Sequence, residues 1–253
     1  WRITVANTGA GTVVGLVVVD TVSAVLVGVA TDQPAALGPP TSTPVGGGGG
    51  IAFRSAASGT NGSSQTPSLT IPGPAGLVDG DVMIASVSHS DLGGQTVTPP
   101  AGWTLVRRID SGDLTLTVFV KVAAGEPGSY IWNFGAAVRA NGGIVAYSGV
   151  DPVAPIDAEN GVATPGNTTH ATPSITTTVP NAILVASFAT PEQVSWNPPG
   201  GMAERYDIFN PGGGTNFKPT TAVDDEAWAV AGATGARTGV STVADVGAAH
   251  LLA

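Results

Sequence analysis

Acidic residues are the first candidates for chemistry in this chain, because several lie close together in short turns. Asp79 and Asp81 flank a single glycine, and Asp110 and Asp113 enclose a Ser-Gly pair. Carboxylates on flexible turns are the ligands that Ca²⁺ prefers. Aspartate beside glycine also stabilises turns by accepting hydrogen bonds from nearby backbone, and we favour this structural role. Ca²⁺ at these four residues is the alternative, and no other metal or cofactor is expected.

Tryptophan beside acidic residues raises the question of carbohydrate chemistry. Three acids, residues 224–226, precede Trp228. A glycosidase needs two carboxyl groups about 5–10 Å apart at a sugar site, and one acidic cluster does not supply that pair. Trp196 lies between two polar residues before a Pro-Pro-Gly-Gly turn. We predict that Trp196 is exposed and name it as the candidate ligand-contacting residue, with burial in the core as the alternative.

Histidine, cysteine and nucleotide-binding patterns give no support for an enzyme. His89, His170 and His250 are far apart in the chain and lack the short spacing of paired metal ligands. The chain has no cysteine, which excludes disulfides and thiolate metal sites. It also has no G-x-S-x-G, P-loop or G-x-G-x-x-G pattern. We therefore predict that the protein is not an enzyme.

Composition and charge narrow the setting in which the chain works. Only 11% of the 253 residues are charged, the formal net charge is −9, and the nine Lys and Arg residues form no cluster beyond Arg107-Arg108. Nucleic-acid binding requires clustered basic residues, so this class of partner is excluded. Low charge, an acidic balance and many Ser, Thr and Gly residues favour an extracellular protein of a cell surface or a virion.

Short β-strands must position these side chains. The 36 glycines and 20 prolines separate runs rich in Val and Thr, a pattern typical of strands joined by turns. In residues 114–122, Leu and Val alternate with Thr, Phe and Lys, which indicates two distinct faces. We predict an all-β fold, a large antiparallel β-sandwich of jelly-roll type over residues 51–253. Its expected strands are residues 51–55, 68–71, 81–89, 103–109, 114–122, 130–134, 143–148, 174–179, 182–189, 226–231 and 248–251.

Two segments about 100 residues apart repeat the same order of features. Residues 81–110 and 181–208 each contain an apolar strand, a variable loop, a Pro-Pro-x-Gly turn and a strand with arginine. Repeated units of this kind bury each other's apolar faces. The sequence therefore predicts an internal duplication with two similar sheets packed face to face, and chance similarity between β-rich segments is the alternative.

The N-terminal segment, residues 1–37, is a separate β-rich piece. Residues 13–30 are strongly apolar, but Asp20 at their centre divides them into two β-branched runs of strand length, so no membrane span is expected. Residues 3–5, 7–9 and 17–21 resemble the strand, N-T-G and valine-rich D-T pattern of a repeat domain on bacterial and archaeal surface proteins. The resemblance implies a partial immunoglobulin-like segment that is too short to close its own core.

This segment is either the tail of a longer domain or a set of strands that pairs with a neighbouring subunit. In the second case, the candidate assembly residues are the valines of the apolar runs, namely Val13, Val14, Val17, Val18, Val19, Val25 and Val27. Residues 38–50 form a Pro/Gly linker whose hinge is Gly46, Gly47, Gly48, Gly49 and Gly50. Five flexible glycines span roughly 12 Å.

A second resemblance covers nearly all of residues 51–253. The stretches IAFRSAASGTNGSS, PAGLVDGDVMIASVS, TPPAGWTLVRRIDSG, GGIVAYSGVDPVAPID and AGATGARTG, in this order, resemble a domain of phage tail and fibre proteins and of secreted bacterial surface proteins. The resemblance implies a non-enzymatic structural or adhesive module and brings no functional residue. We expect a subunit of a surface filament or fibre that pairs with itself or with a neighbouring surface or tail protein. The alternative is a phage tail-fibre or adhesin module that binds cell-surface glycan.

Overall fold

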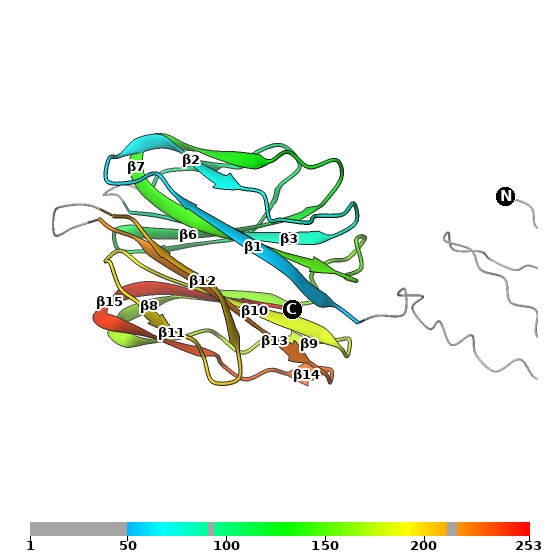
Figure 1. Ribbon diagram of the computed structural model, residues 1–253. Coiled ribbons are helices and arrows are strands. Elements are labelled where there is room, and N and C mark those ends of the chain that lie inside the picture. Colours follow the sequence, from blue (N-terminus) through cyan, green and yellow to red (C-terminus); the bar gives the residue numbers. More distant parts are fainter. Residues whose placement is uncertain (1–49, 91–93, 212–216) are drawn as a thin grey trace, which may run out of the picture. The chain divides into compact units, whose positions relative to one another are not determined.

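The computed structural model describes residues 50–90, 94–211 and 217–253 (Figure 1). The predicted N-terminal β segment, its seven valines and hinge residues Gly46 to Gly49 lie outside the described residues, so those predictions stay open. No helix in the described part of the chain is long and apolar enough to cross a membrane.

Every regular element in the described ranges is a β-strand, and all strand pairs are antiparallel, as predicted. We call β1–β7 the first half and β8–β15 the second half. The strands of the first half are β1 (Ala52–Thr60), β2 (Thr66–Pro72), β3 (Val82–Ser90), β4 (Val97–Thr98), β5 (Thr104–Ser111), β6 (Leu114–Val122) and β7 (Ser129–Ser148). Those of the second half are β8 (Glu159–Ala171), β9 (Thr176–Thr177), β10 (Ala182–Thr190), β11 (Trp196–Asn197), β12 (Ala203–Phe209), β13 (Thr220–Trp228), β14 (Gly232–Ala233) and β15 (Thr238–Leu252).

The internal duplication predicted from the sequence is present in the strand order. In the first half β7, β3, β6 and β5 are neighbours in this order, and in the second half β15, β10, β13 and β12 repeat it. Short strand β4 pairs with the long β7, as β11 pairs with β15. Strand β8 pairs with both ends of β15. In the first half β1 and β2 share this role, because each pairs with one end of β7. The two halves therefore share one arrangement of strands.

Three apolar cores alternate with the sheets, and the middle core joins the two halves. The first core lies between the main sheet of the first half and the strands around β2, and includes Phe119 and Trp132. The middle core contains side chains from both halves, such as Leu116 and Val223. The third core lies on the other face of the second sheet and includes Phe188. Burying one such side chain contributes about 1.5–3 kcal/mol. Because many side chains from both halves are buried together in the middle core, the two halves are packed as one body (Figure 1).

Strand β6 shows how this stacking changes the expected pattern. Leu114, Leu116 and Val118 face the middle core, whereas Phe119 faces the first core. The threonines between them, Thr115 and Thr117, are also buried. The alternation correctly indicates two faces, but both faces of this strand are covered because a sheet lies on either side.

Several strand boundaries differ from the prediction, and each difference has a local cause. Residues 130–134 and 143–148 belong to one strand, β7, which runs from the outer layer into the main sheet. Strand β8 was not predicted because it is rich in Asn, Thr and Gly, contains Pro165 and is mostly exposed. Strand β13 begins at Thr220 and ends at Trp228, earlier than expected, because its Thr and Asp residues are buried between sheets.

Candidate functional site

A group of buried polar side chains lies where the two halves meet, which we call the junction. Ser86 of β3 and Ser187 of β10 are hydrogen-bonded across it, with their Oγ atoms 2.8 Å apart. Thr221 of β13 donates to the Asn141 Oδ1 at 2.6 Å, and Ser88 donates to the same oxygen at 3.1 Å. These side chains are fully or almost fully buried. Buried polar groups with partners fix one arrangement of the halves, because sliding would leave them unpaired.

Asn141 extends this network towards the loops at one end of the junction. Its Nδ2 donates to the Asn210 Oδ1 at 2.9 Å and also to the carbonyl of Pro219. Asn210 in turn donates to the Asn61 Oδ1 at 3.0 Å. Asn61 belongs to an Asn-Gly-Ser sequon, but its Nδ2 donates to the Val138 carbonyl at 2.8 Å. The asparagines are therefore occupied in holding strands from both halves together.

A salt-bridge cluster crosses the junction at the edge of the stacked sheets. Arg107 of β5 binds Glu159 of β8 through two bonds, from Nε at 2.6 Å and from Nη2 at 2.8 Å. His250 of β15 lies 3.0 Å from the same carboxylate through Nε2. Hydrogen bonds from His250 and Arg107 lower the pKa of Glu159 to about 2. Burial lowers the pKa of His250, although Glu159 opposes this change.

The opposite edge of the junction has a second cluster, centred on Asp225 of β13. Its carboxylate accepts a hydrogen bond from the Tyr147 hydroxyl at 2.6 Å and one from Arg205 Nη2, also at 2.6 Å. The Arg205 guanidinium carbon lies 3.8 Å from the centre of the Phe53 ring. Burial and the neighbouring carboxylate raise the pKa of Tyr147 well above its ordinary value. Strands β1 and β12 are thereby attached to each other, as β5 and β8 are at the first cluster.

Asp224 faces away from the junction, because adjacent residues of a strand point to opposite faces. Asp224 is 1% exposed, and neither carboxylate oxygen has a hydrogen-bond partner among the residues that the structure describes. Burial raises the pKa of Asp224 to about 7, and the charges of Glu204, Asp207 and Asp225 add to this shift. Asp224 and Asp225 therefore do not converge on one open cleft, which is the arrangement that glycoside hydrolysis requires.

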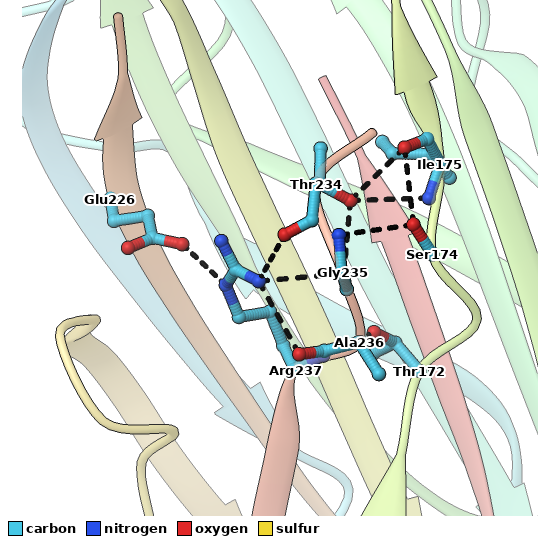
Figure 2. A network of polar contacts seen from close by, with 8 residues as sticks. All are labelled: Thr172, Ser174, Ile175, Glu226, Thr234, Gly235, Ala236 and Arg237. Atoms are coloured by element: carbon cyan, nitrogen blue, oxygen red, sulfur yellow. Dashed lines mark hydrogen bonds and ion pairs between the residues drawn. The ribbon is translucent and has the colours of Figure 1, made fainter. Parts of the chain in front are cut away.

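Arg237 is the centre of a polar network that fastens a loop of the second half, shown in Figure 2. Its guanidinium pairs with Glu226, donates to the Thr234 carbonyl at 2.7 Å and lies 5.3 Å from the centre of the Trp228 ring. The Thr234 side chain bonds both the N–H and the carbonyl of Ile175, at 3.1 and 3.2 Å. The polar side chains drawn in Figure 2 therefore have protein partners, and the network ties β13 and β14 to the segment before β10.

The prediction that Trp196 is exposed is wrong. The residue is 5% exposed, and its ring centre lies 5.5 Å from that of Phe188 and 5.1 Å from that of His170. Its backbone N–H donates to Asp207 at 2.9 Å. The polar neighbours of Trp196 occupy the outward positions of a short strand, so alternation directs the tryptophan itself inward. As a buried residue, Trp196 is not available to stack on a sugar.

Of the four aspartates considered for Ca²⁺, Asp79 and Asp113 lie in turns, Asp81 directly precedes β3, and Asp110 is near the end of β5. Asp81 pairs with Arg54 and accepts the Val78 N–H at 2.9 Å, and Asp79 accepts the Gly125 N–H at 2.8 Å. Asp110 pairs with Arg108 at 2.8 Å. Asp113 is on an exposed turn, where its backbone carbonyl accepts the Ser90 hydroxyl at 3.2 Å. Within the described ranges, no group of three His, Cys, Asp or Glu residues is placed to hold a metal ion.

A pocket of about 140 Å³ opens at one end of the junction, beside the loop that connects the halves. Its floor is formed by four side chains of the middle core, Val82, Ile84, Val185 and Leu252. No part of the sequence indicated this pocket, because its lining comes from five separate places in the chain. Comparison of the chain with protein-family models, with curated proteins and with solved structures gives no match.

Proposed function

We propose that this protein is an extracellular structural subunit of a surface filament or fibre, assembled by β-strand pairing of its N-terminal segment. The observation that supports this most directly is the use of its charged side chains. Arg107, Arg205 and Arg237 each pair with a carboxylate that lies outside their own strand or loop. The Arg107 pair crosses the junction. These pairs are partly buried, and their hydrogen bonds hold the strands in fixed relative positions. Strands held in fixed positions are a property expected of a rigid building unit.

The N-terminal segment supplies the means of assembly in this proposal. Its two valine-rich runs have the length and composition of strands, and the unpaired edge of a strand is a template for a strand of another chain. Residues 38–50 are expected to provide reach, because a proline-rich sequence favours an extended chain and five glycines favour a flexible one. Strand pairing would give affinity through backbone hydrogen bonds, and the valine side chains would give specificity through burial.

Deletion of residues 1–37 tests the proposal directly. The full chain is expected to form oligomers or filaments, and the shortened chain is expected to be a folded monomer. Size-exclusion chromatography with light scattering and negative-stain electron microscopy measure both outcomes. Replacing Val17, Val18 and Val19 by Thr is the matched control for strand propensity, because Thr keeps the β-branch and loses apolar surface. Assembly that survives the deletion would contradict the proposal.

Binding of cell-surface glycan is the alternative function expected from the sequence. Its candidate contact residue was Trp196, and this side chain is buried beside Phe188 and His170. Trp196→Ala is therefore expected to reduce folding stability, by roughly 3–5 kcal/mol for a buried Trp. A glycan array with the full chain, read against the shortened chain, separates glycan recognition from self-assembly.

A further inference from the structure

The pocket at the end of the junction is apolar at its base. Val82 and Ile84 come from β3 in the first half, and Val185 and Leu252 come from β10 and β15 in the second. Pro155 and Pro180 form part of the wall. A cavity of about 150 Å³ lined by such side chains is able to hold a benzene-sized apolar molecule, and this pocket has about 140 Å³. Its size therefore suits a short alkyl chain.

The mouth of the pocket differs from its base, because it combines exposed apolar and acidic side chains. Val179 lines the pocket and is 49% exposed, and Val153, on the adjoining loop, is 90% exposed. Large exposed apolar side chains beside a cavity are typical of binding sites. Asp151 and Asp157 also line the pocket. A ligand would therefore meet apolar surface first and carboxylates at the rim.

The charge at the rim is one-sided. Asp151 accepts the Val153 N–H through Oδ1 at 2.9 Å, and its side chain is exposed. Asp157 is held in place by the Thr178 N–H at 2.6 Å. Of the described residues that line the pocket, none is Lys, Arg or His. A cationic group at the mouth would be attracted by both carboxylates, whereas an anionic one would be repelled.

From this geometry we propose that the pocket binds a cationic amphiphile, a molecule with a short alkyl chain and a positively charged head group. The alkyl chain lies on Ile84, Val185 and Leu252, and the head group lies at the mouth beside Asp151. The site is small and partly open, so affinity for a six-carbon chain is expected in the millimolar range. This proposal does not rest on the proposed assembly, and its failure would leave that assembly untouched.

Titration of the full chain with hexylammonium chloride, followed by two-dimensional ¹H–¹⁵N NMR, tests this site. Saturable shifts are expected at the backbone amides of Ile84, Val185 and Leu252. Methylammonium, which has the charge without the chain, is expected to leave these amides unchanged. Hexanoate is expected to bind up to about fivefold more weakly, because an exposed charge contact is worth up to about 1 kcal/mol. Shifts scattered over the acidic surface, or equal binding of hexanoate, would overturn the proposal.

Blocking the mouth provides a test by mutation. Ala154 lines the pocket on an exposed loop, so Ala154→Trp is expected to fill the mouth and abolish the hexylammonium shifts. Ala124→Trp, at an exposed loop position away from the pocket, is the matched control and is expected to retain them. Val179→Trp is the second blocking variant if the first does not give a folded spectrum. Asp151→Asn is expected to narrow the difference between hexylammonium and hexanoate. Unchanged binding by a folded blocked variant would overturn the site.

Discussion

Ser86 and Ser187 occupy the same position in the two halves, and their hydroxyl oxygens lie 2.8 Å apart across the junction. Ser86 is opposite Val118 on β6, and Ser187 is opposite Val223 on β13. Both serines are buried. A contact between equivalent residues is expected only near an approximate twofold axis that relates the halves. The serine pair therefore marks where that axis passes through the protein.

The serine pair makes a specific prediction about coupling. Ser86→Ala and Ser187→Ala, made singly, each leave one buried hydroxyl without its partner across the junction, at a cost of about 1–3 kcal/mol. The double variant removes both groups and is expected to lose less than the sum of the two single variants. Urea unfolding of the four proteins measures this coupling. Strictly additive losses would contradict a direct interaction between the serines.

The same equivalence places Asp224 where the first half has Phe119. Ala85 is opposite Phe119 on β6, and Ala186 is opposite Asp224 on β13. A buried carboxylate without a hydrogen-bond partner is costly in its charged form. Its pKa of about 7 lies above the ordinary value of 3.8, so the folded protein binds a proton that the unfolded chain has lost. Asp224 therefore lowers stability as pH rises from about 4 to about 7 and keeps that cost above 7.

Asp224→Asn is expected to stabilise the protein at pH 8, by about 1–3 kcal/mol of removed charge burial, and to stabilise it less at pH 5. Asp225→Asn is the matched control one residue away. It weakens the acceptor for Tyr147 and Arg205, so it is expected to destabilise the protein at both pH values. Unfolding midpoints in urea at the two pH values measure both effects. A stabilisation by Asp224→Asn that is equal at pH 5 and pH 8 would contradict the charge argument.

Local pattern in the sequence was enough to predict the all-β fold and the duplication. Strand β6 was predicted with its observed boundaries because the alternation of apolar residues over 114–122 is unbroken. The similarity of residues 81–110 and 181–208 correctly indicated two related halves, since strand order is determined by which apolar faces must be covered. Strands that are polar and lie at an edge, such as β8, gave no such signal.

Side-chain partners could not be predicted in the same way, because they depend on contacts between distant residues. Arg107 and Glu159 are 52 positions apart and come from different halves. The exposure predicted for Trp196 relied on its polar neighbours, which occupy the opposite face of the strand. The pocket is formed by the ends of strands that the chain visits at widely separated points. Such features require knowledge of how the two halves stack.

Glu159 gives a prediction for acid conditions. Its pKa of about 2 lies below the ordinary 4.5, because His250 and Arg107 donate hydrogen bonds to the charged form. The stabilisation is therefore fully present above about pH 4.5 and is lost as pH falls towards 2. Glu159→Gln is expected to cost about 1–3 kcal/mol at pH 7 and progressively less below pH 4.5. The exposed Asp113→Asn is the control and is expected to change stability little at pH 7. Chemical unfolding across this pH range measures the difference, and a cost of Glu159→Gln that does not vary with pH would contradict the assignment.

Gly143 tests how closely the halves approach at the junction. It is opposite Ser86 on β3, and a Cβ atom at this position would lie 2.6 Å from the ring of Tyr206 and 2.8 Å from the carbonyl oxygen of Ala57. The equivalent position in the second half is His250, which is opposite Ser187, so only one side of the axis has room for a side chain. Gly143→Ala is expected to cost about 1–3 kcal/mol through overpacking.

Tyr206→Leu in the Gly143→Ala background is expected to recover only part of this loss, because the contact with the Ala57 backbone remains. Gly200→Ala is the matched control, since a Cβ atom there would meet nothing within 4 Å, and its effect on stability is expected to stay within about 0.5 kcal/mol. Thermal and urea unfolding of these variants measure the costs. If Gly143→Ala were as stable as the control variant, the two halves would have to lie further apart at the twofold axis. The hydrogen bond between Ser86 and Ser187 would then also be too long to form.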